Sequence, residues 1–298
     1  MRIRVAQPDD APAVVALRAT VYPYLVRGVE STRTMLSDPP PTPGWTAFVA
    51  EVDDRVVGWV SAEPNARTST ANFGDINLLH VHPEHRRHGI GTALLAAATG
   101  HLTPLGVRRV RAWAQPDSLP FARHHGFESS REVRYSALDL DPAPAFPTPP
   151  EGVRLRPIAD VDPHLLYAAD VASAVDEPGD VPVDAVSYQS WQSDVWDNLG
   201  LDKSASTVVE VDGAVAAFSL VKRDGDRMWS DYTASVPTYR GRGLARLAKT
   251  AALSRAAADG VRVAYTSNDE ANAPMLAINA RLGYRPVGAQ WSCLADLR

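Results

Sequence analysis

Short apolar runs separated by polar turns give each half of the chain the same hairpin pattern. The runs and turns are residues 46–52, 53–55 and 56–61 in the first half, and residues 207–211, 212–213 and 214–220 in the second. Two short apolar runs joined by a few turn residues are typical of paired antiparallel strands. We therefore predict one β-hairpin in each half.

The same series of elements follows each hairpin. A strand leads into a glycine-containing turn, a helix and a second strand follow, and a last helix ends at glycine plus an aromatic residue before a final strand. The strand, helix and strand are predicted at residues 76–81, 92–101 and 108–114, and again at residues 230–235, 246–259 and 262–266. An internal repeat of this kind indicates two copies of one domain.

A proline-rich segment separates the copies. Residues 141–152 contain five prolines, a density that continues neither a helix nor a central strand. We therefore predict a first domain at residues 1–140, a semi-rigid linker at 141–152 and a second domain at 153–298. A length of 298 residues suits two ordinary domains.

Composition narrows the class of protein. A net charge of −5 gives no reason to expect nucleic acid or an anionic membrane as partner. The chain has no apolar run of the roughly 20 residues that span a bilayer, and its start does not read as a secretory signal. The single cysteine, Cys293, excludes an internal disulfide and fits a reducing compartment. We expect a cytoplasmic protein without a metal site, monomeric or weakly dimeric.

Both halves place an arginine- and glycine-containing turn between a strand and a helix. The turns are Arg86-Arg87-His88-Gly89-Ile90-Gly91-Thr92 and Arg240-Gly241-Arg242-Gly243-Leu244-Ala245. The first turn of a helix has unpaired N–H groups and a positive dipole end, which suit a diphosphate. Glycine permits close approach of the backbone, and arginine supplies charge. The doubled motif predicts two diphosphate-binding turns.

These turns resemble the acyl-CoA-binding turn of the GCN5-related N-acetyltransferase (GNAT) family. The order of elements is similar in both copies, and the tandem layout resembles mycothiol synthase and related two-domain acetyltransferases. The resemblance implies an α/β fold of two tandem GNAT domains, each a mixed, mostly antiparallel twisted sheet flanked by helices. It also implies acetyl-CoA as the acyl donor and the amine of a small molecule as the acceptor.

The resemblance assigns further roles to residues along the acyl-CoA arm. Backbone groups around Val81 in the first copy, and Ser235 and Val236 in the second, would pair with the pantetheine as an added strand. An asparagine at the start of the last helix would contact the same arm. Asn272 matches that asparagine, and Gln115 stands there in the first copy.

The general acid implied by the resemblance is missing from both copies. The family has a tyrosine near the end of the last helix that protonates the leaving thiolate. Ala122 and Asn279 occupy that position here. Asn279 is kept as a candidate catalytic residue, and His124 and His125 are alternatives in the first copy.

Acyl transfer to an amine also needs a base. Deprotonating a lysine-like amine at pH 7 costs on the order of 4–5 kcal/mol, so a positioned carboxylate is valuable. The resemblance implies an acidic residue on the strand before the turn, where Asp75 lies in the first copy. In the second copy Trp229 matches, and Asp231 lies two residues further on, facing the same side if the strand is regular. Each aspartate could instead be an ordinary strand-edge residue.

The sequence leaves the active half and the function class open. Asp75 and the full Gly-x-Gly of the first turn favour the first half, whereas Asn272 and the acidic segment at residues 170–184 favour the second. We expect the second half to be active, with the first half binding acyl-CoA or serving a structural role. That segment is either a lid that attracts a cationic amine or a solvated face. Two rival functions are a catalytically silent acyl-CoA-binding or sensor protein and a protein-modifying acetyltransferase.

Overall fold

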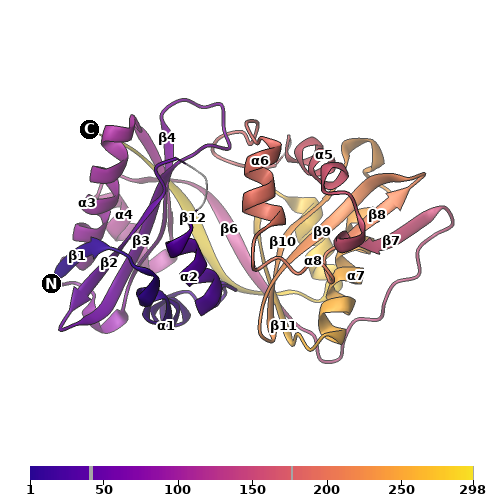
Figure 1. Cartoon of the computed structure of the whole chain (residues 1–298), viewed down its shortest axis with the longest axis horizontal. Helices are drawn as coiled ribbons and strands as arrows, with labels where there is room; N and C mark the ends of the chain where they lie inside the picture. The colour runs from indigo at the N-terminus through magenta and orange to yellow at the C-terminus, as the bar shows by residue number, and fades with distance from the viewer. Residues whose placement is uncertain (40–42, 176, 298) are drawn as a thin grey trace. The chain divides into compact units, whose positions relative to one another are not determined.

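The computed structural model describes residues 1–39, 43–175 and 177–297. The chain forms two compact units, drawn in Figure 1. Unit 1 contains residues 1–133 and the segment that begins at Ala289, and unit 2 contains residues 134–288. Each unit is a mixed sheet with helices on its faces, which confirms the α/β class and the two similar copies expected from the repeat.

The sheet of unit 1 has the strand order β1-β2-β3-β4-β5-β12-β6. Neighbouring strands from β1 to β4 are antiparallel, β4 and β5 are parallel, and β12 is antiparallel to β5. The strands are β1 (Arg2–Val5), β2 (Thr46–Val52), β3 (Arg55–Pro64), β4 (Phe73–Val81), β5 (Arg109–Ala114), β6 (Glu128–Asp139) and β12 (Arg285–Asp296). The helices are α1 (Ala11–Val21), α2 (Val29–Ser37), α3 (Ile90–Leu102) and α4 (Leu119–His124). The predicted hairpin is β2–β3.

Alternation along β2 and β3 divides the apolar side chains of unit 1 between two layers. Val60 packs with Leu94 of α3 on one face, and Trp59 packs with Leu17 of α1 on the other. Successive strand residues point to opposite faces, so neighbouring residues serve different layers. A Cβ on Gly58 would lie 2.8 Å from Leu94, so this glycine lets α3 approach the sheet closely.

Unit 2 repeats this plan with the strand order β6-β11-β10-β9-β8-β7. Its strands are β7 (Val153–Pro157), β8 (Thr207–Val211), β9 (Ala214–Asp224), β10 (Arg227–Ser235) and β11 (Val263–Asp269). Its helices are α5 (Pro163–Ala174), α6 (Tyr188–Trp191), α7 (Leu244–Ala258) and α8 (Ala273–Leu282). The second predicted hairpin is β8–β9, and α7 occupies the place that α3 has in unit 1.

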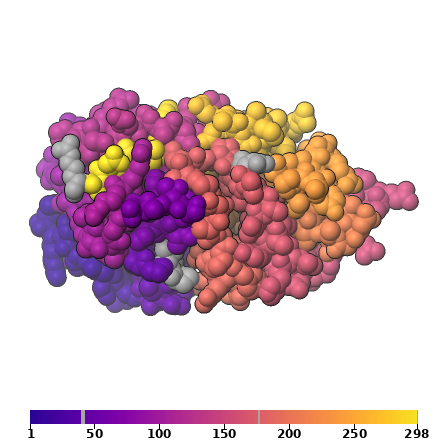
Figure 2. All heavy atoms as spheres, turned by 90° about the horizontal axis from the view of Figure 1, so that it is seen from above, coloured from indigo at the N-terminus to yellow at the C-terminus, as the bar shows by residue number. Residues whose placement is uncertain are grey.

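The last strands of the repeats do not stay within them. Trp291–Asp296 of β12 runs antiparallel to β5 in unit 1, and the hydroxyl of Ser130 donates to the carbonyl of Ser292 across 3.2 Å. Leu140, just after β6, packs in the core of unit 2. Figure 2 shows yellow spheres from the end of the chain among the indigo and magenta spheres of unit 1.

The compact units and the sequence repeat therefore divide the chain at different places. The proline-rich segment at 141–152 lies inside unit 2 and contains neither helix nor strand. Among the residues that the structure describes, no helix is both long and apolar enough to cross a bilayer.

Candidate active site

The parallel strand pair in each unit opens part-way along its length. The β4–β5 ladder covers Phe73–Ile76 of β4 only, and the β10–β11 ladder covers Arg227–Trp229 of β10 only. Beyond these points, β4 and β10 stay paired with β3 and β9. An opening between parallel strands leaves backbone groups on one edge that can pair with an inserted extended chain. Each unit thus offers, beside this opening, a strand edge that an extended chain could pair with, and we call this opening the slot.

A β-bulge accompanies each opening. In unit 1 the β3–β4 register shifts between Trp59 and Ser61, and Leu78 has a φ of 54°, a left-handed value that is rare for leucine. In unit 2 the β9–β10 register shifts between Ser230 and Tyr232, so Asp231 is the extra residue. A bulge bends its strand and breaks the regular alternation. The expectation that Trp229 and Asp231 face the same side assumed a regular strand and does not apply.

The two glycine turns adopt the same backbone conformation. Gly89 and Gly243 are the N-caps of α3 and α7, with φ of 78° and 74°. Two residues earlier, Arg87 and Gly241 also have positive φ, at 67° and 76°. A Cβ on Gly89 or Gly243 would meet no atom within 4 Å. Glycine is therefore required by the backbone and not by crowding, and the space above each helix start is open to a ligand.

The same hydrogen bond links each turn to the strand before it in both units. Arg86 Nε donates to the carbonyl of Val81 across 3.2 Å, and Arg240 Nε donates to the carbonyl of Ser235 across 3.3 Å. These two arginines brace the strand ends, and Arg86 also pairs with Asp117 at 3.3 Å. Arg86 and Arg240, which the sequence predicted to bind a diphosphate, therefore also make hydrogen bonds that stabilise the fold.

The remaining residues of the two turns differ in how much of each side chain is exposed to solvent. Arg87, His88, Gly241 and Arg242 are exposed, whereas Ile90 and Leu244 are buried in the cores of their units and offer a ligand only their backbone. Ala245 is half-buried.

Helix α4 covers the first turn of α3 in unit 1. The Phe121 ring lies 3.3 Å from the position of a Cβ on Gly91, and Thr92 Oγ1 lies 3.1 Å from His125 Nε2. Burial and the nearby His124 lower the pKa of His125. The alternative general acid of the first copy is therefore bonded to a residue of the predicted diphosphate turn.

Three residues at positions predicted to contact the pantetheine arm already make hydrogen bonds within the protein. The N–H of Val236 donates to Ala216, and its carbonyl accepts from Tyr239, across 3.0 and 2.8 Å. Gln115 Nε2 donates to the carbonyl of Val21 across 3.1 Å. Asn272 caps α8 through its side-chain oxygen, which accepts from Met275 N across 3.3 Å. The cap uses only the oxygen of that amide.

The two candidate bases occupy different parts of their strands. Asp75 is buried, and its carboxylate accepts from Arg111 Nε and from Asn65 Nδ2, each across 2.8 Å. Asp75 pairs with Arg111 in the parallel ladder, below the opening. Asp231 lies beyond the last paired residue, within the opened part, where it forms an ion pair with Lys222 at 2.8 Å. Only Asp231 borders the slot of its unit.

Asn279 belongs to a buried polar chain that sequence reasoning missed. Its Nδ2 donates to Asn268 Oδ1 across 2.5 Å, and its Oδ1 accepts from Lys249 Nζ of α7. Lys249 also lies 4.8 Å from the centroid of the Tyr284 ring, and burial lowers its pKa to about 7. The sequence did contain one sign of this buried chain. Lys249 lies one helical turn before Leu253, on the face of α7 that packs into the core, and a lysine facing the core is rare.

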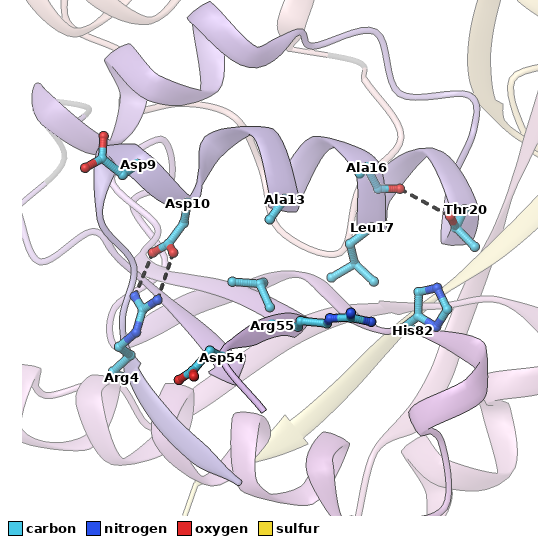
Figure 3. A pocket seen from close by; sticks show the side chains of 11 residues that line it. Arg4, Asp9, Asp10, Ala13, Ala16, Leu17, Thr20, Asp54, Arg55 and His82 are labelled. Carbon is cyan, nitrogen blue, oxygen red and sulfur yellow. Dashed lines mark hydrogen bonds and ion pairs between the residues drawn. The ribbon is translucent and has the colours of Figure 1, made fainter. Parts of the chain in front are cut away.

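A pocket of about 500 Å³ in unit 1 contains none of these residues. Figure 3 shows it between α1 and the turn that joins β2 to β3. At its edge Arg4 pairs with Asp10 and Glu51, each at 2.7 Å. Burial alone would raise the pKa of Asp10, but the hydrogen bonds from Arg4 and from the N–H of Gln7, together with the charge of Arg4, hold this pKa below its usual value. In the part of the chain described, no three His, Cys, Asp or Glu side chains gather in a metal-binding group.

Comparison with known proteins decides the family. The model of the Acetyltransferase (GNAT) family matches residues 14–127 and again residues 173–284. The chain belongs to the GNAT family. It is a tandem GNAT N-acyltransferase, as the doubled turn motif predicted, and members of this family use acetyl-CoA.

Individual relatives and solved structures align with both halves of this chain. The mycothiol acetyltransferase of Nocardioides sp. is 28% identical over 248 residues, which cover 78% of this chain and 82% of that protein. The mycothiol acetyltransferase of Actinosynnema mirum is 30% identical over 215 residues, covering 69% and 70%. Among solved structures, a tandem GNAT protein from the clavulanic acid biosynthesis pathway is 23% identical with a TM-score of 0.78, covering 100% of this chain and 98% of that one. A GCN5-related N-acetyltransferase from Sphaerobacter thermophilus is 19% identical with a TM-score of 0.75, covering 100% and 96%.

Proposed function

We propose that this protein transfers the acetyl group of acetyl-CoA to the primary amine of a small molecule, and that unit 2 is the catalytic half. The observation that carries the proposal is the position of Asp231 in the opened part of β10, the strand that leads into the glycine turn of α7. The corresponding carboxylate of unit 1, Asp75, is held in the paired part of its strand. Unit 1 then binds acyl-CoA or supports the fold.

In this proposal the main chain of unit 2 positions the donor. The diphosphate accepts N–H groups at Gly243, Leu244 and Ala245, where the helix dipole favours negative charge. The pantetheine lies along the opened edge of β10, and the Asn272 amide contacts it. The N–H of Ser235 is the candidate donor to the thioester oxyanion, because that of Val236 is already bonded within the sheet.

The side chains of unit 2 then move the protons. Asp231, released from Lys222, accepts a proton from the ammonium directly or through one water. The neutral nitrogen attacks the thioester carbon, the C–N bond forms, and the C–S bond breaks. The nitrogen loses its second proton as the amide forms, and this proton passes through water to the leaving thiolate. A carboxamide is not an acid at pH 7, so Asn279, which stands where the family tyrosine is expected, orients the thiolate by a hydrogen bond from its amide and does not protonate it. Its amide is held in one orientation by Lys249 and Asn268.

The acceptor class rests on the relatives. Proteins named mycothiol acetyltransferase align over most of their length with this chain, which supports a small-molecule amine related to mycothiol. We infer further that the protein acts in the cytoplasm as a monomer or weak homodimer, without metal or nucleic acid. Its net charge of −5 and single cysteine support this. The repeat-based domains 1–140 and 153–298 remain our proposal for its evolutionary units.

The test is thiol release from acetyl-CoA with a panel of small amines, including the amine precursor of mycothiol, with products identified by mass spectrometry. Asp231→Asn should lower kcat about 100-fold or more, whereas Asp75→Asn should leave kcat within a few-fold. The opposite result would place the active site in unit 1. Tight acetyl-CoA binding with no thiol release for any amine would favour the silent binding or sensor protein.

A further inference from the structure

Unit 1 buries two side chains whose N–H donors have no acceptor. Arg18 of α1 is 3% exposed and Trp59 of β3 is 1% exposed. Within the described structure, Arg18 Nε, Arg18 Nη2 and Trp59 Nε1 have no hydrogen-bond partner. Arginine and the indole N–H are donors only, and an unsatisfied buried donor is costly. These three atoms all require acceptor oxygens.

The two unsatisfied atoms of Arg18 lie on one edge of its guanidinium plane. Nη1, on the other side, donates to Thr32 Oγ1 at 3.4 Å. An edge formed by Nε and one Nη makes two parallel hydrogen bonds to the oxygens of a carboxylate or phosphate. The Arg18 guanidinium also lies 5.9 Å from the Trp59 ring centroid, so the arginine and the indole belong to one cluster.

No carboxylate is among the described groups that shift the pKa of Arg18. Burial, together with Arg27, lowers the pKa of Arg18 to about 9. The neighbouring His80 of β4 has its pKa lowered to about 3 by burial and by Arg18 and Arg86, so its imidazole is neutral at pH 7. A negative ligand would offset the positive charge of the buried Arg18 guanidinium. A carboxylate is favoured over a phosphate dianion because desolvating one negative charge costs less.

The cluster lies beside the opened part of unit 1. His80 pairs with Trp59 in the β3–β4 ladder, four residues beyond the last contact of β4 with β5. The Tyr22 ring, just after α1, lies 5.9 Å from the His80 ring. A ligand on Arg18 would therefore contact the α1 face of β4, next to the slot for an acyl chain.

We propose that unit 1 binds a small molecule with a carboxylate, held bidentately by Arg18 Nε and Nη2 with the Trp59 N–H beside them. This site is separate from the catalytic site proposed in unit 2 and does not depend on it. Because Arg18 is buried and bonded to Thr32 of α2, we expect the ligand to enter by displacing α2 and the segment before it. Binding should then slow hydrogen exchange in residues 22–37.

The test is calorimetry on the full chain with pairs of ligands that differ only in the carboxylate. L-serine, L-cysteine and L-glutamate are each compared with their α-carboxamides, and inorganic phosphate and sulfate are added at equal ionic strength. We expect a saturable signal for at least one acid, at least tenfold weaker binding of its carboxamide, and protection of residues 22–37. No binding by any acid, or equal binding by acid and carboxamide, would overturn the proposal. Equal binding of phosphate or sulfate would overturn the carboxylate assignment.

Three variants separate ligand binding from folding. Arg18→Met removes the donors at similar volume and should weaken acid binding at least tenfold, while its melting temperature without ligand should be equal or higher because an unpaired cation is gone. Arg18→Lys keeps the charge but loses the fork, so it should also bind weakly if Arg18→Met fails to fold. Arg33→Met on α2 removes an exposed charge paired with Glu30 and should bind as the wild type does. Unchanged binding by Arg18→Met or Arg18→Lys would contradict the site.

Discussion

The Nζ atom of Lys249 donates a hydrogen bond of 2.7 Å to Oδ1 of Asn279, and both side chains are buried in unit 2. Because lysine is only a donor, the bond assigns the amide oxygen of Asn279 to Lys249 and its Nδ2 to the side of β11. The helix that carries the glycine turn thus fixes the orientation of a residue on the last helix.

Lys249→Met should change how stability depends on pH. Burial lowers the pKa of Lys249 from 10.5 to about 7, so between these values the unfolded chain binds more protons than the folded protein. The free energy of unfolding of the wild type should therefore rise with pH across that window, by up to about 1.4 kcal/mol per pH unit from this group. Urea unfolding at pH 7, 8 and 9 measures the slope. Lys249→Met should lose this contribution, and an identical slope in both proteins would contradict the prediction.

Asp75→Asn should destabilise unit 1 more than it affects catalysis. The substitution removes the charged partner of Arg111 at 2.8 Å, in a site where both side chains are largely buried. The expected loss is about 1–3 kcal/mol. Asp117→Asn, which removes the exposed partner of Arg86, is the matched control and should cost about 1 kcal/mol or less. Equal effects in denaturant melts of the two variants would show that burial of the Asp75 pair is unimportant.

The sequence alone predicted the features that depend only on residues close together in the chain. The hairpins and the turns before α3 and α7 follow from local alternation and from glycine at Gly89 and Gly243, and all are present. The bulge at Asp231 was not predictable, because it depends on how β10 pairs with β9. The core-facing position of Lys249 signals that its side chain is buried, but its bond to Asn279 joins two helices, and the sequence does not give that partner. The exchange of β12 into unit 1 is likewise a choice between two similar sheets that alternation cannot distinguish.

Gly89→Ala should be destabilising although a Cβ there would meet no atom within 4 Å. Its φ of 78° is left-handed, and such a conformation costs an L-residue about 1–2 kcal/mol. Gly100→Ala, at an exposed position inside the same helix, should instead stabilise by up to about 1 kcal/mol. Thermal unfolding of both variants measures the difference. A neutral Gly89→Ala would mean that the turn relaxes without cost.

Ending the chain after Gly288 should damage unit 1. The truncation removes the residues of β12 that pair with β5, and it also removes Cys293, which is 1% exposed in the core of unit 1. Hydrogen exchange should accelerate in residues 109–114, whose ladder partner is lost, more than in residues 207–211 of β8. Faster exchange in β8 than in β5 would contradict the assignment of β12 to unit 1.

The position of β12 has a consequence for biosynthesis. Residues 289–297 complete the sheet that residues 1–133 begin, yet they leave the ribosome after all of unit 2. During synthesis, the edge of β5 that later pairs with β12 stays unpaired, and another strand could pair with it instead. A fragment cut between the sequence repeats would keep that incomplete sheet, so the first half depends on the end of the chain to finish folding.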